Sequence, residues 1–266
     1  MLKVIVLSLG IMAIATLMTM TGRGGGNFYV PVLVAGGAAM HQAATTGQCI
    51  LLATAVAALL VFQRKKTVDW KLAMVIDPPT DVMALVGGYY AHLFSGGILK
   101  LVFAGLLVIT GFFMLRPVKE QLPSGNKRFG FWRREFDGRE YVVNLWLAMP
   151  ITAATGLVAG MVGISGGSFK VPLMVLGCGV PMRVAVGTSS AMVAATALMG
   201  LIGHSAAGDF NASLALPMSA AAVVGGLLGG TFSLKTKSAS LKKIFAYTTL
   251  AAALFMILNV WLSAAA

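Results

Sequence analysis

Long stretches without charge are the feature that most constrains this chain. Its Lys, Arg, Asp and Glu residues make up only 11% of 266 residues and are gathered in a few segments. The apolar stretches between them reach about 18 residues or more, the length that crosses a bilayer core as a helix. With 58% hydrophobic residues and a mean hydropathy of +0.88, the chain has too few charges to cover a water-facing surface. The sequence therefore predicts an all-α integral membrane protein and argues against a soluble enzyme, a disordered chain and nucleic-acid binding.

A motif near the N-terminus recurs in the second half of the chain. The segment GRGGGNFYVPVL at 22–33 aligns with GISGGSFKVPLM at 163–174, at a constant offset of 141 residues. The same offset sets ATTGQ at 44–48 against AVGTS at 185–189. Such self-similarity indicates a duplication. It divides the chain into a first transmembrane repeat at 1–115, a basic linker at 116–142 and a second transmembrane repeat at 143–266.

Each repeat is expected to hold several long apolar helices and one short helix. The long helices are expected at about 3–21, 43–62, 73–94, 98–115, 143–162, 184–203, 211–233 and 242–262. The short segments at 28–39 and 169–180 follow the glycine-rich runs, and at ~1.5 Å per residue each reaches only about half-way across a bilayer. The sequence thus predicts about 8 long transmembrane helices plus two half-helices at glycine-rich breaks.

The distribution of basic residues predicts the orientation, because Lys and Arg collect in cytoplasmic loops. They gather at 63–71, in the linker 116–142 and at 235–243, whereas the loop at 204–210 carries Asp209 and no Lys or Arg. We therefore expect a multi-pass protein of a prokaryotic inner membrane, with a cytoplasmic linker and both termini outside. Equivalent loops of the two repeats then face opposite sides, so the second repeat is inverted. Inverted repeats with interrupted helices are typical of secondary transporters.

The two glycine-rich breaks are expected to hold an anion. Glycine permits the turn and exposes backbone N–H groups, and each half-helix points its positive end at the break. A broken helix persists in hydrocarbon only where protein or a wet cavity satisfies its backbone. The predicted substrate-binding residues are Arg23, Gly24, Gly25, Gly26, Asn27, Thr45, Thr46 and Gln48 in the first repeat, with Ser165, Gly166, Gly167, Ser168, Thr188 and Ser189 in the second.

Several charged residues leave two interpretations open. Arg23 can donate two hydrogen bonds to an oxyanion, or it can extend to the membrane interface. Asp77 and Asp81 flank a Pro-Pro pair, and either carry a coupling proton or sodium ion or begin a capped helix near the cytoplasmic surface. Lys170 lies one turn into its half-helix, where a contact with a lipid headgroup is an equal alternative.

The paired motifs resemble the sulfite exporter TauE/SafE family, also called the toluene-sulfonate uptake permease family, over essentially the whole chain. That family shows a Gly-x-Gly-Gly-Gly run, an apolar stretch with Pro-x-Leu, and an Ala-x-Gly-Thr-Ser element, typically in both halves. This chain departs from the pattern at Arg23, at Ser165 and at 44–48. The resemblance implies transport of small sulfur-containing anions such as sulfite, thiosulfate or organosulfonates.

The predicted function is secondary transport of such an anion by alternating access. A passive anion channel is the first alternative, and a membrane assembly factor or a membrane enzyme is a different class. The sequence shows no His/Cys spacing of a metal site and no nucleophile elbow, so no enzyme activity, cofactor or metal is expected. The expected partners are the small sulfur-containing anion, the lipid bilayer and a coupling proton or sodium ion, without nucleic acid.

Overall fold

A computed structural model of the chain describes residues 2–93, 96–115, 129–162, 166–205, 210 and 212–265. The protein is 82% helical, which confirms the predicted all-α class. The first half contains α1 (Leu2–Thr19), α2 (Gly26–Ala35), α3 (Met40–Arg64), α4 (Trp70–Ile76), α5 (Pro78–Tyr90), the 3₁₀ turn η1 (Ala91–Leu93) and α6 (Gly96–Leu115). The second half contains β1 (Phe131–Phe136), β2 (Arg139–Asn144), α7 (Leu145–Val162), α8 (Gly167–Pro172), the π-helical turn η2 (Leu173–Gly177), α9 (Met182–Ser205), α10 (Ala212–Lys235) and α11 (Ser238–Ala265).

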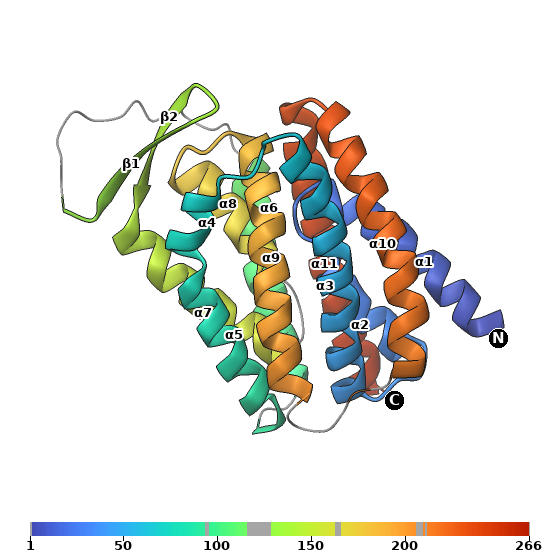
Figure 1. The fold of residues 1–266 in the computed structure, drawn as a ribbon. Coiled ribbons are helices and arrows are strands. Elements are labelled where there is room, and N and C mark those ends of the chain that lie inside the picture. Colours follow the sequence, from blue (N-terminus) through green and yellow to red (C-terminus); the bar gives the residue numbers. More distant parts are fainter. Residues whose placement is uncertain are drawn as a thin grey trace.

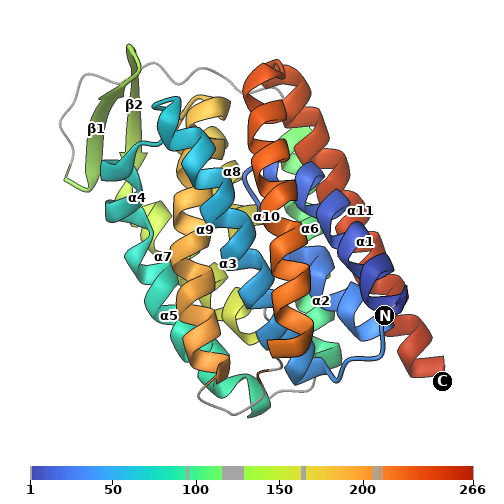
Figure 2. The same ribbon diagram turned by 45° about the vertical axis from the view of Figure 1, so that its right-hand side comes forward.

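The long helices form two layers (Figures 1 and 2). In the first layer, neighbouring helices pack in the order α7, α5, α9, α3, α10 and α1. Helices α6 and α11 pack against each other in the second layer. The short helices lie between the layers, since α2 contacts α3 and α11 while α8 contacts α9 and α6. The segments that follow the two glycine-rich runs are therefore enclosed by longer helices.

The two short helices match the half-helices expected at 28–39 and 169–180. Helix α2 spans 10 residues, and α8 continues through Pro172 into the π-helical turn. Because proline has no N–H group, a regular helical hydrogen bond is lost at Pro172. The chain then widens, and the N–H of Cys178 donates to the carbonyl of Leu173 at 3.1 Å, five residues back.

The single helix expected at 73–94 is in fact two helices, α4 and α5, which meet at Asp77. Pro78 and Pro79 supply no N–H groups, so the helical hydrogen bonds are interrupted there. The carbonyl of Asp77 accepts hydrogen bonds from the N–H groups of Thr80 at 2.7 Å and Asp81 at 3.1 Å, which starts α5. The prolines thus bend the chain at a carboxylate inside the apolar region.

Within the described residues, four helical segments are long and apolar enough to cross a membrane. They are Gln42–Arg64, Leu145–Val162, Met182–Ser205 and Ala212–Lys235. Shorter apolar helices occur at Val4–Thr19, Gly26–Ala35 and Gly167–Gly177. These helices agree with a multi-pass integral membrane protein, and the total of about 8 long helices stays a prediction.

A β-hairpin lies partly within the segment expected as a charged linker. Strands β1 and β2 pair antiparallel around a turn at Asp137 and Gly138. The hairpin lies at the end of the bundle where α3 leads into α4 and α10 leads into α11, and both termini lie at the opposite end (Figures 1 and 2). The basic segments 63–71 and 235–243 therefore share one end with the hairpin.

A buried carboxylate attaches this hairpin to the helices. Asp69, directly before α4, accepts hydrogen bonds from Arg134 Nε at 3.0 Å and Arg134 Nη2 at 2.9 Å. The Tyr141 hydroxyl and the N–H of Leu72, at 3.2 Å, donate to the same carboxylate. Burial alone raises the pKa of Asp69, but these hydrogen bonds and the Arg134 charge hold that pKa below its usual value.

We expect the attachment of the hairpin to depend on pH. A carboxyl whose pKa is lowered by folding stabilises the fold above its unfolded pKa, about 3.9, and this stabilisation is lost as pH falls through the lower folded pKa. Asp69→Asn should release the hairpin at neutral pH and reduce the free energy of unfolding by roughly 1–3 kcal/mol. Hydrogen exchange of residues 131–144 between pH 7 and pH 3 measures both effects.

Glu140→Gln is the control for that experiment. Glu140 and Arg133 form an exposed ion pair at 4.0 Å on the same hairpin, and such pairs contribute little. Hairpin amides that exchange equally slowly in the parent and in Asp69→Asn at every pH would contradict the role given to Asp69.

Candidate functional site

The two glycine-rich breaks meet inside the bundle. Asn27 Nδ2 donates a hydrogen bond to Ser168 Oγ at 2.7 Å, and these residues are separated by 141 positions, the offset of the sequence repeat. Gly167 lies against the first break, where a Cβ on it would come 3.0 Å from the Gly22 carbonyl oxygen and 3.1 Å from Arg23 Cα. Ser165 lies outside the described residues. The beginnings of α2 and α8 therefore adjoin.

The first break leaves hydrogen-bond donors at the start of α2. Gly25 has a φ of +99°, a conformation that favours glycine, and it directly precedes the helix. Within the described part of the chain, the backbone N–H groups of Gly24, Gly25, Gly26 and Asn27 find no acceptor. The Asn27 Oδ1 atom is buried and also lacks a partner there. These donors lie at the positive end of α2, where an anion is stabilised.

Arg23 is buried beside this break, with only 1% of its surface exposed. Its Nε donates to Thr21 Oγ1 at 3.1 Å and its Nη1 donates to Thr249 Oγ1 at 2.6 Å. Its Nη2 donates to the Thr248 hydroxyl, and the guanidinium carbon lies 4.4 Å from the centre of the Phe245 ring. The guanidinium therefore faces α11 and is enclosed by the protein.

Arg23 has no carboxylate partner among the residues that the structure describes. Threonine hydroxyls and an aromatic ring supply dipoles and a quadrupole but no opposite charge. A buried guanidinium without a counter-charge is costly, and a bound anion would remove that cost. Among the described residues, this uncompensated charge next to unpaired backbone donors makes the first break the candidate anion site.

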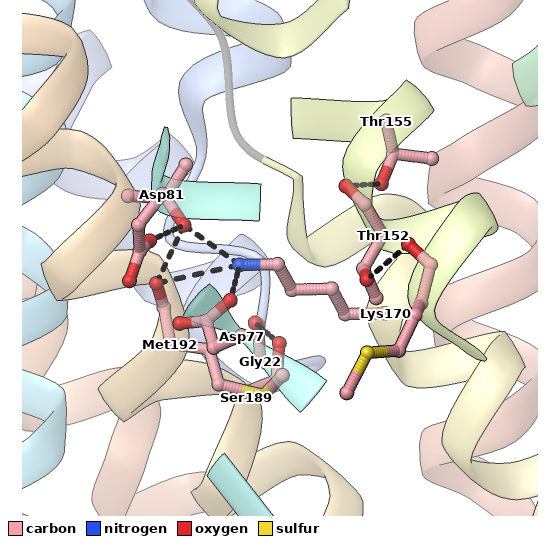
Figure 3. A network of polar contacts seen from close by, with 10 residues as sticks. Gly22, Asp77, Asp81, Thr152, Thr155, Lys170, Ser189 and Met192 are labelled. Carbon is pink, nitrogen blue, oxygen red and sulfur yellow. Dashed lines mark hydrogen bonds and ion pairs between the residues drawn. The ribbon is translucent and has the colours of Figure 1, made fainter. Parts of the chain in front are cut away.

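A second buried cation lies in the segment after the other break (Figure 3). Lys170, whose side chain is 0% exposed, forms an ion pair with Asp77. Its Nζ also donates to Thr196 Oγ1 at 2.7 Å and to the Met192 carbonyl at 3.4 Å. The Thr196 hydroxyl is 2.8 Å from Asp81 Oδ1, so it connects the lysine to a second carboxylate. This cluster joins α8 to α5 and α9.

The contacts of this cluster bear on the interpretations that the sequence left open for Lys170, Asp77 and Asp81. Lys170 points into the bundle, so its partner is a carboxylate and not a lipid headgroup. Asp77 makes no side-chain capping hydrogen bond at the start of α5 and uses its carboxylate on Lys170 instead. Asp81 lies one turn further along α5 and is half-buried.

The predicted polar residues of α9 lie in two different places. Ser189 Oγ donates to the Gly22 carbonyl at 2.7 Å, so Ser189 belongs to the junction of the breaks. Thr188 Oγ1 accepts a hydrogen bond from the N–H of Asp69 at 3.0 Å. Thr188 therefore supports the loop before α4 and the attached hairpin. Ser189 therefore lies at the junction of the two breaks, and Thr188 lies at the end of the bundle that carries the hairpin.

The predicted polar residues of α3 are buried. Thr46 Oγ1 and both amide atoms of Gln48 have no hydrogen-bond partner within the described chain. Gln48 lies beside α9, where a Cβ on Gly200 would come 2.9 Å from Gln48 Nε2. Thr45 is buried on the same helix. Buried polar atoms without partners are uncommon, and local strain, an ordered water, an ion or a ligand can account for them.

Residues on α9 and α11 were missed by the sequence analysis. Thr248 and Thr249 contact Arg23 across more than 220 positions of the chain, and no local spacing connects segments so far apart. Thr196 was missed for the same reason. Lys170 did carry a signal, because a lone lysine in an apolar half-helix needs a partner inside the membrane.

The described residues offer no candidate metal centre. No group of three or more His, Cys, Asp or Glu side chains is assembled among them. The two cysteines are free: Cys178 is buried and Cys49 is half-buried, with its Sγ 3.7 Å from Ser219 Oγ. The polar groups that gather at the two breaks are hydrogen-bond donors and a small cluster of opposite charges.

Known proteins are similar to this chain over almost its whole length. The protein named "Probable membrane transporter protein YunE" of Bacillus subtilis (strain 168) is 26% identical over 253 residues, which cover 91% of this chain and 92% of that protein. A "Probable membrane transporter protein" of Xylella fastidiosa (strain Temecula1) is 24% identical over 247 residues, which cover 91% of this chain and 90% of that protein. No solved structure matches the chain.

The sequence profile of one protein family, described as "Sulfite exporter TauE/SafE", matches residues 6–256. The match includes both glycine-rich breaks, the Lys170 cluster and the threonines of α11 that contact Arg23. It confirms the family resemblance carried by the paired motifs. The chain belongs to the sulfite exporter TauE/SafE family of membrane transporters.

Proposed function

We propose that this membrane transporter moves a small sulfur-containing anion, such as sulfite, thiosulfate or an organosulfonate, by alternating access. The family description names sulfite, and the buried charge of Arg23 gives a physical reason for an anionic substrate. That uncompensated guanidinium is the observation that carries the proposal. A bound anion supplies the negative charge that the described protein residues do not supply.

The groups around Arg23 suit an oxyanion. A guanidinium presents a planar fork of N–H donors that matches two oxygens of a sulfite or sulfonate group. The N–H groups at the start of α2, next to Arg23 in the chain, are proposed as further donors, as expected for the predicted set Gly24 to Asn27. The Thr248 and Thr249 hydroxyls can rotate to donate to the anion when it replaces them as the partner of Arg23.

The remaining predicted residues, from both repeats, are proposed to form the side of the site opposite Arg23. Ser168 already contacts Asn27, and Gly167 contacts the first break. Thr46 and Gln48 carry buried polar atoms without partners and are proposed to bind the anion or its water in another conformation. Ser165, Gly166, Thr45 and Ser189 complete that side, whereas Thr188 is proposed to position the loop before α4.

The packing of the helices supports a pair of inverted repeats. Helix α1 packs on α10, and its counterpart α7 packs on α5. Helix α2 packs on α3 and α11, and its counterpart α8 packs on α9 and α6. Two pairs of equivalent helices pack directly on each other: α3 on its counterpart α9, and α6 on its counterpart α11. Exchange of conformations between two such repeats opens the central site to one side of the membrane and then to the other.

The end of the bundle that carries the hairpin is proposed to face the cytoplasm of a prokaryotic cell. The basic segments near α4, the hairpin and the α10–α11 connection share this end, and both termini share the other (Figure 1). Lys and Arg are retained on the cytoplasmic side during insertion. The linker 116–142 is then inside, and the termini are outside.

The Lys170 cluster is proposed to bind the coupling ion. One ammonium group faces two carboxylates, Asp77 and Asp81, in the apolar interior. The excess negative charge is stable there only when a proton or a sodium ion accompanies it. Asp77 is held by the lysine, so Asp81 is the carboxylate available to that cation. Ion binding at Asp81 would act on α9 through Thr196 and on the second break through Lys170.

We expect Arg23→Gln to reduce transport strongly. Loss of charge-assisted hydrogen bonds costs roughly 1.5–3 kcal/mol, or about 10- to 150-fold in affinity. Uptake of sulfite, thiosulfate, sulfate, taurine and acetate into proteoliposomes, with matched amounts of folded protein, measures the loss. Arg23→Lys should retain part of the activity, and Arg133→Gln on the exposed hairpin should retain all of it.

The same assay tests the alternatives. Undiminished transport by Arg23→Gln would remove Arg23 from the site. Flux that saturates at carrier rates supports alternating access, whereas large single-channel currents in planar bilayers would establish a passive channel instead.

We expect Asp81→Asn to uncouple transport from the ion gradient. Anion exchange without a gradient should continue, while the response to a pH jump and to a sodium jump should disappear. Asp77→Asn should also destabilise the protein by roughly 3–5 kcal/mol, because it leaves Lys170 buried without a partner. Glu140→Gln, at an exposed carboxylate of the hairpin, is the control. Proton and sodium dependence that are both unchanged in Asp81→Asn would end the coupling proposal.

A further inference from the structure

A pocket of about 710 Å³ opens at the end of the bundle that carries the hairpin. Its walls come from the last turns of α3 and α10, the first turn of α9 and the turn of the hairpin. Its basic lining residues are Arg64, Lys65, Arg183 and Lys235, and its acidic lining residue is Asp137. The pocket therefore carries an excess of positive charge.

These positive charges are available to a ligand. None of the four basic side chains forms an ion pair with another described residue. Among the described residues, Arg183 donates from Nη2 to the Thr236 carbonyl at 3.3 Å, and the guanidinium has further donors. A concave surface lined by charges of one sign raises the local concentration of ions of the opposite sign. The chemistry of this pocket thus selects anions.

Helix α9 both lines the pocket and contacts the first break. Val184 lines the pocket, and two residues further along α9 the backbone of Val186 lies against Gly22, where a Cβ on Gly22 would lie 2.8 Å from the Val186 carbonyl oxygen. Ser189 donates to the Gly22 carbonyl from the next turn of the same helix. The same helix therefore lines the pocket and holds the residue that precedes Arg23.

The α10 wall makes the same connection. Leu234 lines the pocket, and the neighbouring Ser233 donates to the carbonyl of Met20 at 2.9 Å. Met20 lies at the end of α1, where the chain enters the break. Two helices that line the pocket, α9 and α10, therefore contact residues 20 and 22, close before Arg23 in the chain.

We propose that this basic pocket is the inner mouth of the transport pathway and binds a small oxyanion before the contact between Gly22 and α9 opens. The inference rests on the proposed function and adds a binding site to it. The ligand is a compact anion with several oxygen atoms, such as thiosulfate or sulfite. A phospholipid headgroup carries the same chemistry, so the experiment must separate the two sources.

The test compares two variants of equal charge. The first neutralises the pocket with Arg64→Gln, Lys65→Gln, Arg183→Gln and Lys235→Gln. The control neutralises exposed residues of the same end outside the pocket, with Lys71→Gln, Arg133→Gln, Lys237→Gln and Lys243→Gln. Thiosulfate transport is measured in phosphatidylcholine vesicles that hold the protein in one orientation, with the anion offered on either side.

We expect the pocket variant alone to raise the KM for thiosulfate on the pocket side, by about tenfold. The KM on the opposite side and the values for the control should not change. Calorimetric titration of thiosulfate into the purified parent should show binding that the pocket variant weakens by a similar factor. Equal KM values for the two variants on both sides would overturn the proposal.

A lipid occupant gives a different result. If the variants differ only in vesicles that contain phosphatidylglycerol, and mass spectrometry shows this lipid lost from the pocket variant, the pocket holds a headgroup and the mouth assignment is wrong. A parent protein that transports none of the tested anions contradicts the proposed function itself. A parent that transports thiosulfate with a KM indifferent to the pocket charges contradicts only this inference.

Discussion

The hydrogen bond between Asn27 and Ser168 joins two interrupted helices inside an apolar protein, and the site is organised around that junction. Irregular backbone at membrane depth is tolerated only where protein or water satisfies its polar groups. The two breaks meet that requirement only in part: Gly167 packs on Gly22 and Arg23, and Ser189 donates to the Gly22 carbonyl. The N–H groups at the start of α2 are left without an acceptor among the described residues. The junction then directs Arg23 toward α11 and leaves Lys170, one turn into the other segment, facing α5 and α9.

The two buried cations have different surroundings, and we therefore propose different roles for them. Lys170 is paired with Asp77 and is linked through Thr196 to Asp81. Arg23 is held by hydroxyl groups and an aromatic ring. These two cations and two carboxylates sum to no net charge. The proposed binding of one anion at Arg23 together with one cation at Asp81 would keep that balance, which is a physical argument for the coupling that we propose.

Local patterns in the sequence predicted much of the helical structure. The half-helix expected at 28–39 is α2, and long helices expected at 43–62 and 184–203 are α3 and α9. The length of an apolar stretch and the position of a glycine-rich run are enough to predict such helices, because both are properties of neighbouring residues in the sequence. The bend at Asp77 was also readable from Pro78 and Pro79 but was not expected.

The hairpin and the charged partners show where local patterns stop. An Asp-Gly turn between alternating residues at 131–144 is a strong hairpin signal. The segment was nevertheless interpreted as part of a linker, because it carries many charged residues. The pairing of Lys170 with Asp77 spans 93 positions and that of Arg23 with Thr249 spans 226. Such contacts are decided by how helices pack, which a single sequence does not specify.

The location of a bound anion tests the central claim most directly. Selenite has the charge and pyramidal shape of sulfite, and selenium scatters X-rays anomalously. Crystals of the protein soaked in selenite should show an anomalous peak within hydrogen-bond distance of the Arg23 guanidinium, beside the start of α2. Selenite that binds elsewhere in a transport-active protein, with the Arg23 region empty, would contradict the account.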